Sequence, residues 1–223
     1  MHEFSSLVVL NGDVPRGFAA AVLWTLSQQV PRPQIIAADG GGAALLAQEI
    51  RPDILIGDGD SLAQNKREIL ERQGVRRYDL PCAKDFGDGE AALKLALEQN
   101  QGQVALFGAF GGRLDFTIAN LTLPLLFGSQ QARRVVFFGH DFVAHYAEED
   151  EVIRGKEGDA VSFLSLSPEV TGLSLNGFAY PLNDYILKEG SSRCISNIMK
   201  EKLCNVRHRD GELLVIQYRK ENY

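Results

Sequence analysis

The segment Gly57-Asp58-Gly59-Asp60-Ser61 places two carboxylates two residues apart, directly after the apolar run Ile54–Ile56. An extended backbone directs side chains two residues apart to the same side, so Asp58 and Asp60 are expected to act together at the end of a buried strand. Two close carboxylates repel each other unless a cation or a proton lies between them. Oxygen ligands suit hard cations, and Mg²⁺ uses few protein carboxylates while it keeps positions for water and phosphate. The segment therefore predicts a magnesium site for a phosphorylated substrate, although Asp is also common in ordinary turns.

A second acidic segment, Lys84-Asp85-Phe86-Gly87-Asp88, precedes a predicted helix. Asp88 suits a helix N-cap, and Asp85 would then lie in the loop before it. Capping alone explains these residues equally well, and Lys84 either contacts phosphate or is solvated. The loop gains significance because it is expected to face the end of the strand that carries Asp58 and Asp60.

A glycine-rich segment, Gly108-Ala109-Phe110-Gly111-Gly112-Arg113-Leu114-Asp115, follows one predicted strand and precedes a helix. Glycines let backbone N–H groups approach phosphate oxygens, and a helix N-terminus attracts anions. Arg113 adds a planar fork of donors that suits a phosphoryl group. Asp115 either pairs with Arg113 or caps the helix. The segment lacks the Gly-Lys-Ser/Thr ending of a P-loop, and taken alone it is a weak signal.

These segments lie in a half of the chain where short apolar runs alternate with helical patterns. Such alternation predicts an α/β domain whose mainly parallel, Rossmann-like sheet is covered on both faces. Ligands bind at the carboxyl ends of parallel strands, where Asn11, Asp39, Asp58 and the Gly108–Gly112 loop would lie. The expected strands are Leu7–Leu10, Ile35–Ala38, Ile54–Ile56 and Val104–Phe107, and the expected helices are Phe18–Gln29, Ala43–Glu49, Asn65–Gln73, Glu90–Gln99 and Asp115–Phe127.

The pattern changes after about residue 130 to short β-prone segments separated by turn residues. This predicts an all-β C-terminal domain, a small sandwich or barrel. We place the two domains at residues 1–132 and 133–223. The expected strands are Arg134–Phe138, Phe142–Tyr146, Glu151–Arg154, Ala160–Leu166, Gly172–Leu175 and Leu213–Tyr218.

Composition narrows the possible environments and partners. A formal net charge of −6 argues against a protein that coats nucleic acid, because phosphate binding needs a basic face. The three cysteines form no Cys-x-x-Cys pair and are expected to be reduced thiols. The apolar run Leu121–Phe127 contains Pro124 and is too short to cross a bilayer, and no signal peptide is recognisable. A cytoplasmic protein without a membrane partner is therefore expected.

In chain order, the motifs resemble those of the thiamine pyrophosphokinase family. Single pieces are weak, but the likeness covers nearly the whole chain. The matching segments are Ala38-Asp39-Gly40-Gly41, Arg51-Pro52-Asp53, Ile56-Gly57-Asp58-Gly59-Asp60-Ser61, Lys84-Asp85-x-x-Asp88, Gly108-Ala-x-Gly-Gly-Arg113-x-Asp115, Gly177-Phe178-Ala179-Tyr180-Pro181-Leu182, Ser196-Asn197 and Gly211-Glu212-Leu213-Leu214-Val215-Ile216.

The resemblance implies a catalytic α/β domain that binds nucleotide and metal, followed by a β-sandwich for thiamine binding and dimerisation. It implies transfer of a diphosphoryl group from ATP to the hydroxyl of thiamine, giving thiamine diphosphate and AMP, in a homodimer. Carried over by position, the metal ligands are Asp58, Asp60 and Asp88, and we expect these three with Asp85 and Arg113 to be the catalytic residues. The ATP-binding positions are Asn11, Asp39, Gly40, Gly41, Gly108, Gly111, Gly112, Arg113 and Asp115, and the thiamine-binding positions are Asp88, Ser196 and Asn197.

Because of three departures from the family pattern, the identity of the acceptor is less well supported than catalysis by the acidic residues. Gly87 replaces a Thr, Phe116 replaces a His, and the segment Ser191–Ile195 is an unusual lead-in to Ser196. Two other functions therefore remain open. One is a pyrophosphokinase of the same fold that acts on another alcohol, such as a hydroxymethylpterin, and the other is a non-catalytic sensor of nucleotide or thiamine.

Overall fold

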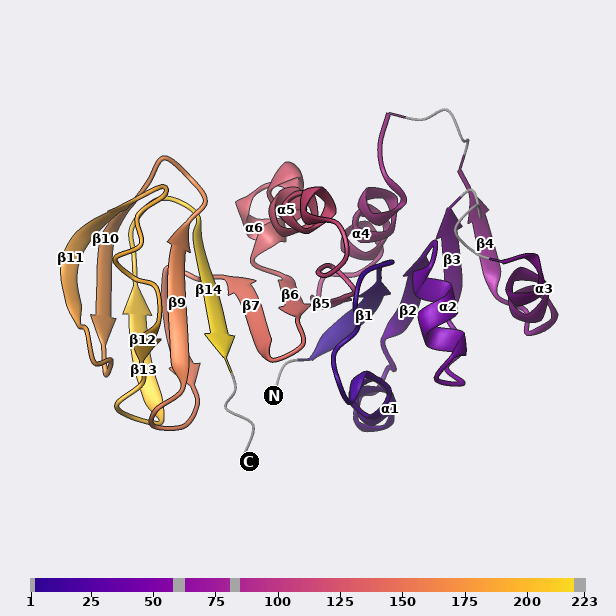
Figure 1. Cartoon of the computed structure of the whole chain (residues 1–223), viewed down its shortest axis with the longest axis horizontal. Coiled ribbons are helices and arrows are strands. Elements are labelled where there is room, and N and C mark those ends of the chain that lie inside the picture. Colours follow the sequence, from indigo (N-terminus) through magenta and orange to yellow (C-terminus); the bar gives the residue numbers. More distant parts are fainter. Residues whose placement is uncertain (1–2, 58–62, 81–84, 219–223) are drawn as a thin grey trace. The chain divides into compact units, whose positions relative to one another are not determined.

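Two units with different secondary structure make up the chain (Figure 1). The computed structural model describes residues 3–57, 63–80 and 85–218. The first unit, Met1–His140, contains all of the described helices, and the second, Asp141–Tyr223, contains β-strands only within its described part. This division confirms the expected order of an α/β part followed by an all-β part.

The first unit is built on parallel strands in the order β6-β5-β1-β2-β3-β4. From β1 the strands proceed through β2, β3 and β4 in one direction, whereas β5 and β6 lie on the other side of β1. The strand order therefore reverses between β1 and β5, which is where parallel sheets open a crevice for ligands. The strands are β1 Phe4–Val9, β2 Gln34–Ala38, β3 Ile54–Gly57, β4 Arg76–Asp79, β5 Gln103–Phe107 and β6 Val135–Phe138.

Helices cover both faces of this sheet because its strands are apolar on both sides. Leu7, Ile35 and Leu55 share a buried cluster with residues of α1, α2 and α3. The neighbouring residues Val8 and Ile36 point to the opposite face, since side chains alternate along a strand, and α4 packs against β1, β2 and β3. The helices are α1 Phe18–Gln28, α2 Gly41–Leu46, α3 Gln64–Arg72, α4 Asp88–Gln99, α5 Leu114–Thr122 and α6 Ser129–Ala132.

The first unit differs from the sequence expectation at the end of α5 and at the domain boundary. The helix expected over Asp115–Phe127 ends at Thr122 and continues as the 3₁₀ segment η1, Leu123–Phe127, because Pro124 has no amide hydrogen for the helix ladder. The strand expected to open the second domain is β6, which pairs in parallel with β5. The first unit therefore extends to His140 instead of ending at residue 132.

The second unit is a β-sandwich. The strands β12, β9, β14 and β7 lie side by side in that order, and β11, β10, β13 and β8 form a second antiparallel sheet. Phe163, Leu173 and Val206 belong to the buried cluster shared by the two sheets. The strands are β7 Phe142–Tyr146, β8 Asp150–Arg154, β9 Ala160–Ser165, β10 Glu169–Asn176, β11 Leu182–Lys188, β12 Asn197–Ile198, β13 Leu203–Arg207 and β14 Leu213–Tyr218.

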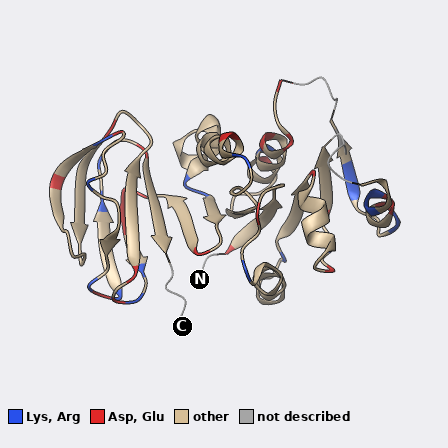
Figure 2. Ribbon diagram, in the orientation of Figure 1, with Lys and Arg blue, Asp and Glu red and all other residues tan. Residues whose placement is uncertain are grey.

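Charge is unevenly distributed in the first unit (Figure 2). The helix α3 and the edge strand β4 carry the densest run of basic residues, and part of this charge is paired. Arg77 lies 2.6 Å from Glu71, and Arg72 lies 3.7 Å from Glu68. Within the described ranges, none of the helices is both long and apolar enough to span a bilayer.

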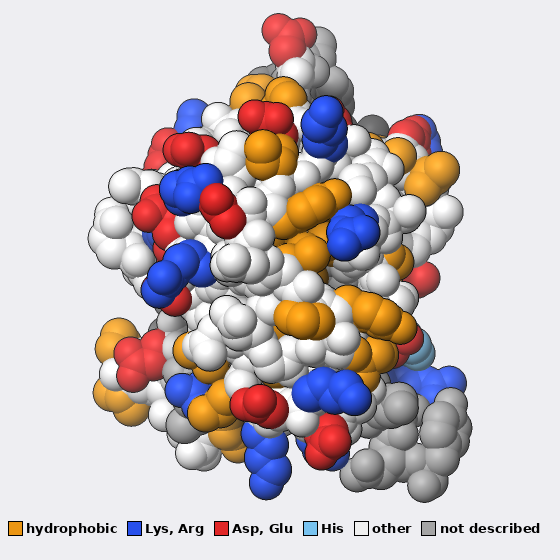
Figure 3. All heavy atoms as spheres, turned by 90° about the vertical axis from the view of Figure 1, so that its left-hand side faces the viewer, with side chains coloured by type: hydrophobic (Ala, Val, Ile, Leu, Met, Phe, Trp, Pro, Cys, Tyr) orange, Lys and Arg blue, Asp and Glu red, His pale blue; other side chains and the backbone are white. Residues whose placement is uncertain are grey.

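The surface of the second unit shows apolar side chains between charged ones (Figure 3). Val152 on β8, Ile186 on β11 and Leu203 on β13 are all more than two-fifths exposed. Their strand neighbours, such as Ile153 and Cys204, point into the core. The outer face of the sheet formed by β11, β10, β13 and β8 is therefore partly apolar.

Candidate active site

The candidate site lies at the carboxyl ends of the parallel strands. Asn11 follows β1, Asp39 follows β2, Gly57 ends β3 and Gly108 follows β5. Asn11 and Gly108 border the reversal of strand order between β1 and β5, and Asp39 and Gly57 lie at the ends of the next two strands, β2 and β3. The structure therefore brings together ATP-binding positions inferred from three separate segments of the sequence, those that contain Asn11, Asp39 and Gly108.

Two carboxylates converge over the last residue of β3. The Oδ1 atom of Asp39 overlaps the position that a Cβ of residue 57 would take, and the Oδ2 atom of Asp88 lies 3.3 Å from the same point. Gly57 has a φ of 141°, which strongly favours glycine. Glycine at this position therefore makes room for both carboxylates, directly before Asp58.

Local backbone structure holds each of these two carboxylates in place. Asp39 has a φ of 45°, and its amide donates to Ile56 O at 3.0 Å while its carbonyl accepts from Gly42 N at 3.1 Å. This residue thus joins β2, β3 and the start of α2. Asp88 is the first residue of α4, where the helix dipole favours a negative charge.

The start of α2 packs against the end of β1 without room for side chains. The carboxamide oxygen of Asn11 occupies the place of a Cβ at Gly40, and the carbonyl oxygen of Val9 occupies that of a Cβ at Gly41. Gly40 and Gly41, which follow Asp39 in the sequence motif, are therefore required because the end of β1 and Asn11 lie too close to the start of α2 for a side chain.

The glycine-rich loop is attached to the segment that follows β1. Gly12 N donates to Gly108 O at 2.9 Å, and Asp13 N donates to Phe110 O at 2.7 Å. The Asp13 carboxylate fills the position of a Cβ at Gly111, whose φ is 91°. Sequence reasoning missed Asp13, although its place two residues after Asn11 was a signal available in the sequence.

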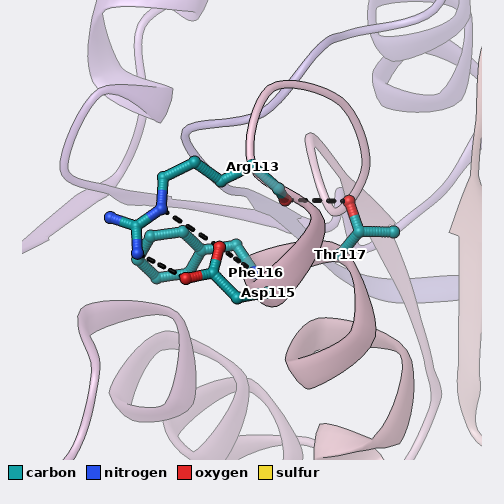
Figure 4. A network of polar contacts seen from close by, with 4 residues as sticks. All are labelled: Arg113, Asp115, Phe116 and Thr117. Atoms are coloured by element: carbon teal, nitrogen blue, oxygen red, sulfur yellow. Dashed lines mark hydrogen bonds and ion pairs between the residues drawn. The ribbon is translucent and has the colours of Figure 1, made fainter.

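Arg113, Asp115 and Phe116 form a cluster at the start of α5 (Figure 4). Arg113 Nε donates to Asp115 Oδ1 at 3.0 Å, and its terminal nitrogen forms an ion pair with Asp115 Oδ2. Phe116 N also donates to Asp115 Oδ1, at 2.9 Å. Asp115 therefore pairs with Arg113, one of the two roles that the sequence left open, and accepts from an amide of the first turn, while the N-cap position belongs to Arg113.

This contact raises the pKa of Arg113 and lowers the pKa of Asp115, in both cases mainly through the side-chain hydrogen bond. Both side chains are largely exposed to solvent. The guanidinium also lies over the ring of Phe116, 4.7 Å from its centroid. Arg113 is thus oriented by its own helix start, with part of its donor fork directed to Asp115.

Asn120 links α5 to the rest of the site and was also missed. Its Nδ2 donates to Ala109 O at 3.0 Å, and its Oδ1 lies 3.8 Å from the position of a Cβ at Gly89. The residue therefore connects the glycine-rich loop with the first turn of α4, next to Asp88. Its spacing of five residues from Asp115 gave no signal of this contact.

Ser196 and Asn197 occupy different environments in the second unit. Asn197 is 2% exposed, and its Oδ1 accepts from Tyr180 N at 3.0 Å while its Nδ2 donates to Tyr180 O at 2.9 Å. Ser196 is exposed, has a φ of 56°, and donates its amide to Ser162 Oγ at 2.9 Å. Asn197 therefore fixes the segment around Tyr180, whereas the Ser196 hydroxyl is accessible.

Part of the inferred metal site lies outside the described residues. The metal ligands Asp58 and Asp60 lie outside them, and so does Lys84, the residue before Asp85 that either contacts phosphate or is solvated. Asp85 is described and lies exposed in the bend before α4. Among the residues that the structure describes, no group of three or more His, Cys, Asp and Glu side chains could hold a metal ion.

The fold and the site together define a class of enzyme in which an α/β unit, with acidic and glycine-rich groups at a sheet reversal, precedes a β-sandwich. Two sequence models match these two parts. "Thiamin pyrophosphokinase, catalytic domain" matches residues 29–137, and "Thiamin pyrophosphokinase, vitamin B1 binding domain" matches residues 147–211. The chain belongs to the thiamine pyrophosphokinase family.

Individual relatives agree with this family. The thiamine pyrophosphokinase of Bacillus subtilis is 30% identical over 165 residues, which cover 73% of this chain and 76% of that protein. A crystal structure of the Bacillus subtilis enzyme superimposes with a TM-score of 0.83 at 24% identity, over 97% of this chain and 100% of the other. The Geobacillus thermodenitrificans structure gives a TM-score of 0.80 at 26% identity, over 97% and 99%.

Proposed function

We propose that this enzyme transfers a diphosphoryl group from ATP to the hydroxyl of thiamine in a Mg²⁺-dependent reaction. The hydroxyl oxygen would bond to the β-phosphorus, the bond from that phosphorus to the oxygen bridging the α-phosphate would break, and AMP would leave. The observation that carries this proposal is the convergence of Asp39 and Asp88 over Gly57, at the end of the strand that leads into Asp58 and Asp60. Family membership supports both substrates.

The described residues fit a magnesium ion in their chemistry. The groups around Gly57 are carboxylate oxygens, the donors that Mg²⁺ prefers, and the missing side chain at Gly57 lets them approach the same point. Asp58, Asp60 and Asp88 would hold the ion, which would neutralise charge on the polyphosphate. Asp39 would add negative charge beside them and favour a bound cation.

The remaining groups would position the nucleotide. Backbone amides of Gly108, Gly111 and Gly112 would bind phosphate oxygens, and Arg113 would contribute its remaining N–H donors. Asn11 and the turn after Asp39 would border the same crevice, as expected for a Rossmann-like nucleotide domain. Catalysis would then come from positioning and electrostatic stabilisation, and Asp88 or Asp85 would accept the proton of the hydroxyl.

The second unit would bind the acceptor. The match to a vitamin B1 binding domain supports this assignment, and the Ser196 hydroxyl is accessible for hydrogen bonding. Asn197 would act by holding the segment around Tyr180.

We also propose a homodimer, which the partly apolar outer face of the sheet with Val152 and Leu203 supports. Light scattering after gel filtration tests this oligomeric state. The net charge of −6 supports the absence of a nucleic-acid partner.

The decisive experiment measures AMP formation from ATP and Mg²⁺ with and without thiamine. Thiamine-dependent AMP together with equimolar thiamine diphosphate supports the proposal. AMP formation with a hydroxymethylpterin, but not with thiamine, would move the reaction to another alcohol. Binding of both ligands without AMP would indicate a sensor.

The metal assignment needs its own variants. Asp58→Asn and Asp88→Asn should each lower kcat by at least a hundredfold at saturating Mg²⁺, whereas Glu98→Gln, an exposed change at the other end of α4, should not. Full turnover by Asp58→Asn would contradict the assignment. Thermal melts of the variants without ligand exclude loss of folding as the cause.

A further inference from the structure

An exposed aromatic ring stands at the first turn of α5, immediately after the glycine-rich loop. Phe116 is 56% exposed, and α5 has no buried residue. One face of the ring is covered by the guanidinium of Arg113, which Asp115 holds in place (Figure 4). The ring and the guanidinium therefore stack on each other at the surface, and the proposed phosphate-binding role of the loop makes no use of the Phe116 ring.

The helix period places this pair at the rim of the candidate site. Phe116 precedes Asn120 by four residues, so the two side chains lie on the same face of α5. Asn120 contacts the loop at Ala109 and approaches Gly89, next to Asp88. Phe116 thus stands one turn closer to the start of the helix, on the side of α5 that faces the loop and α4.

We propose that Phe116, with Arg113 stacked on it, is the surface on which the purine base of the donor nucleotide stacks. This inference rests on the proposed function, because it assigns the base of the ATP whose phosphates the loop would bind. Aromatic rings and guanidinium planes both stack on nucleobases, whose π-faces are planar and uncharged.

The position of the pair favours the purine over thiamine, the other planar ligand of the reaction, because the match to a vitamin B1 binding domain covers residues 147–211 and not α5. The stacking surface also continues directly from the loop Gly108–Gly112, so a base placed there would remain connected to phosphates held by the loop amides.

The test separates the base from the phosphates by comparing ATP with tripolyphosphate. Calorimetry in the presence of Mg²⁺ gives the affinity of each ligand for the wild-type enzyme and for Phe116→Ala and Phe116→Tyr. Phe116→Ala should weaken ATP binding by about five- to a hundredfold, the loss expected for one base–aromatic stack. The affinity of Phe116→Ala for tripolyphosphate should stay within about twofold of wild type, because tripolyphosphate has no base to stack. Phe116→Tyr should retain ATP affinity, because tyrosine keeps the aromatic ring.

Ile118→Ala is the matched control, because Ile118 lies on α5 and is also 56% exposed but is two residues from Phe116 and faces away from it. It should leave both affinities unchanged. Equal losses for ATP and tripolyphosphate in Phe116→Ala, unchanged ATP affinity, or a rise in the thiamine KM alone would each overturn the stacking role. A wild-type enzyme that binds no ATP would overturn the proposed function itself, and the inference with it.

Discussion

The carboxylate of Asp39 lies where a side chain of residue 57 would otherwise begin, so the end of β3 can pass beneath Asp39 only as glycine. The same point is 3.3 Å from the carboxylate of Asp88, at the start of α4. Asp39 and Asp88 come from different segments, and they can approach each other here because residue 57 has no side chain. The geometry of the site depends on this glycine as much as on the carboxylates.

Gly57→Ala should therefore abolish activity. The added methyl group would displace Asp39 and crowd Asp88, and it would also strain a backbone with φ of 141°. We expect kcat/KM to fall by at least a hundredfold in an AMP-formation assay. Gly17→Ala is the matched control for strain, because Gly17 has a φ of 73° but open space around it. Comparable activity loss in both variants would argue against a steric role of Asp39.

Changes at Ser196 and Asn197 should separate binding from stability. Asn197→Ala removes a buried carboxamide that bonds to the backbone N and O of Tyr180, so it should lower the free energy of unfolding by about 1–3 kcal/mol. Ser196→Ala should leave stability unchanged and raise the KM for thiamine. Urea denaturation and steady-state kinetics measure the two effects. If Ser196→Ala changes neither quantity, its hydroxyl does not contact the acceptor.

Arg134→Ala should destabilise the first unit. The guanidinium of Arg134 donates to Leu97 O at 3.2 Å and to Gly102 O at 2.9 Å, and it also bonds to Asn100 O. It thus satisfies carbonyls at the carboxyl end of α4, where a cation is favourable. We expect a loss of about 2–3 kcal/mol in the free energy of unfolding.

Lysine cannot reproduce the fork of donors at position 134, so Arg134→Lys should recover only part of this loss. Arg16→Ala, at an exposed position, serves as the control and should have little effect. A destabilisation by Arg134→Ala no larger than that of Arg16→Ala would show that these hydrogen bonds add nothing net.

The thiols of Cys194 and Cys204 should be unreactive in the folded enzyme. Burial raises the pKa of both thiols, and the charge of Arg193 offsets this only partly for Cys194. A raised pKa lowers the thiolate fraction at any given pH, and the thiolate is the reacting species. In a Cys82→Ser background, a colorimetric thiol reagent at pH 8 should titrate neither residue until denaturant is added. Rapid reaction of native protein would show that the sandwich opens readily.

The regular part of the fold was predictable because continuous apolar runs indicate buried parallel strands and apolar stripes indicate covering helices. The strand β4 was missed because Arg76-Arg77-Tyr78-Asp79 has no apolar run, as suits a strand at the edge of the sheet that the described residues form. The strand β6 was recognised as a strand but assigned to the second domain. The β-propensity of Val135–Phe138 predicts a strand, but it does not indicate that this strand pairs with β5.

The acidic and glycine-rich motifs were likewise visible in the sequence, but their mutual positions were not. Asp13 and Asn120 contact the same loop from segments far apart in the chain, and local sequence does not indicate that they meet there. Arg113 was predicted as a phosphate ligand from its type alone, whereas its ion pair with Asp115 and its position on Phe116 depend on the first turn of α5.

The sequence by itself determined which chemical groups are available and the order in which they occur: carboxylates after strands, glycines before helices, and a β-rich second half. Tertiary structure alone decided which of these groups meet. Asp39 and Asp88 converge over Gly57 because parallel strands end at one edge of a sheet and α4 begins at that edge. Such contacts arise from packing between distant segments, which local periodicity and propensity do not encode.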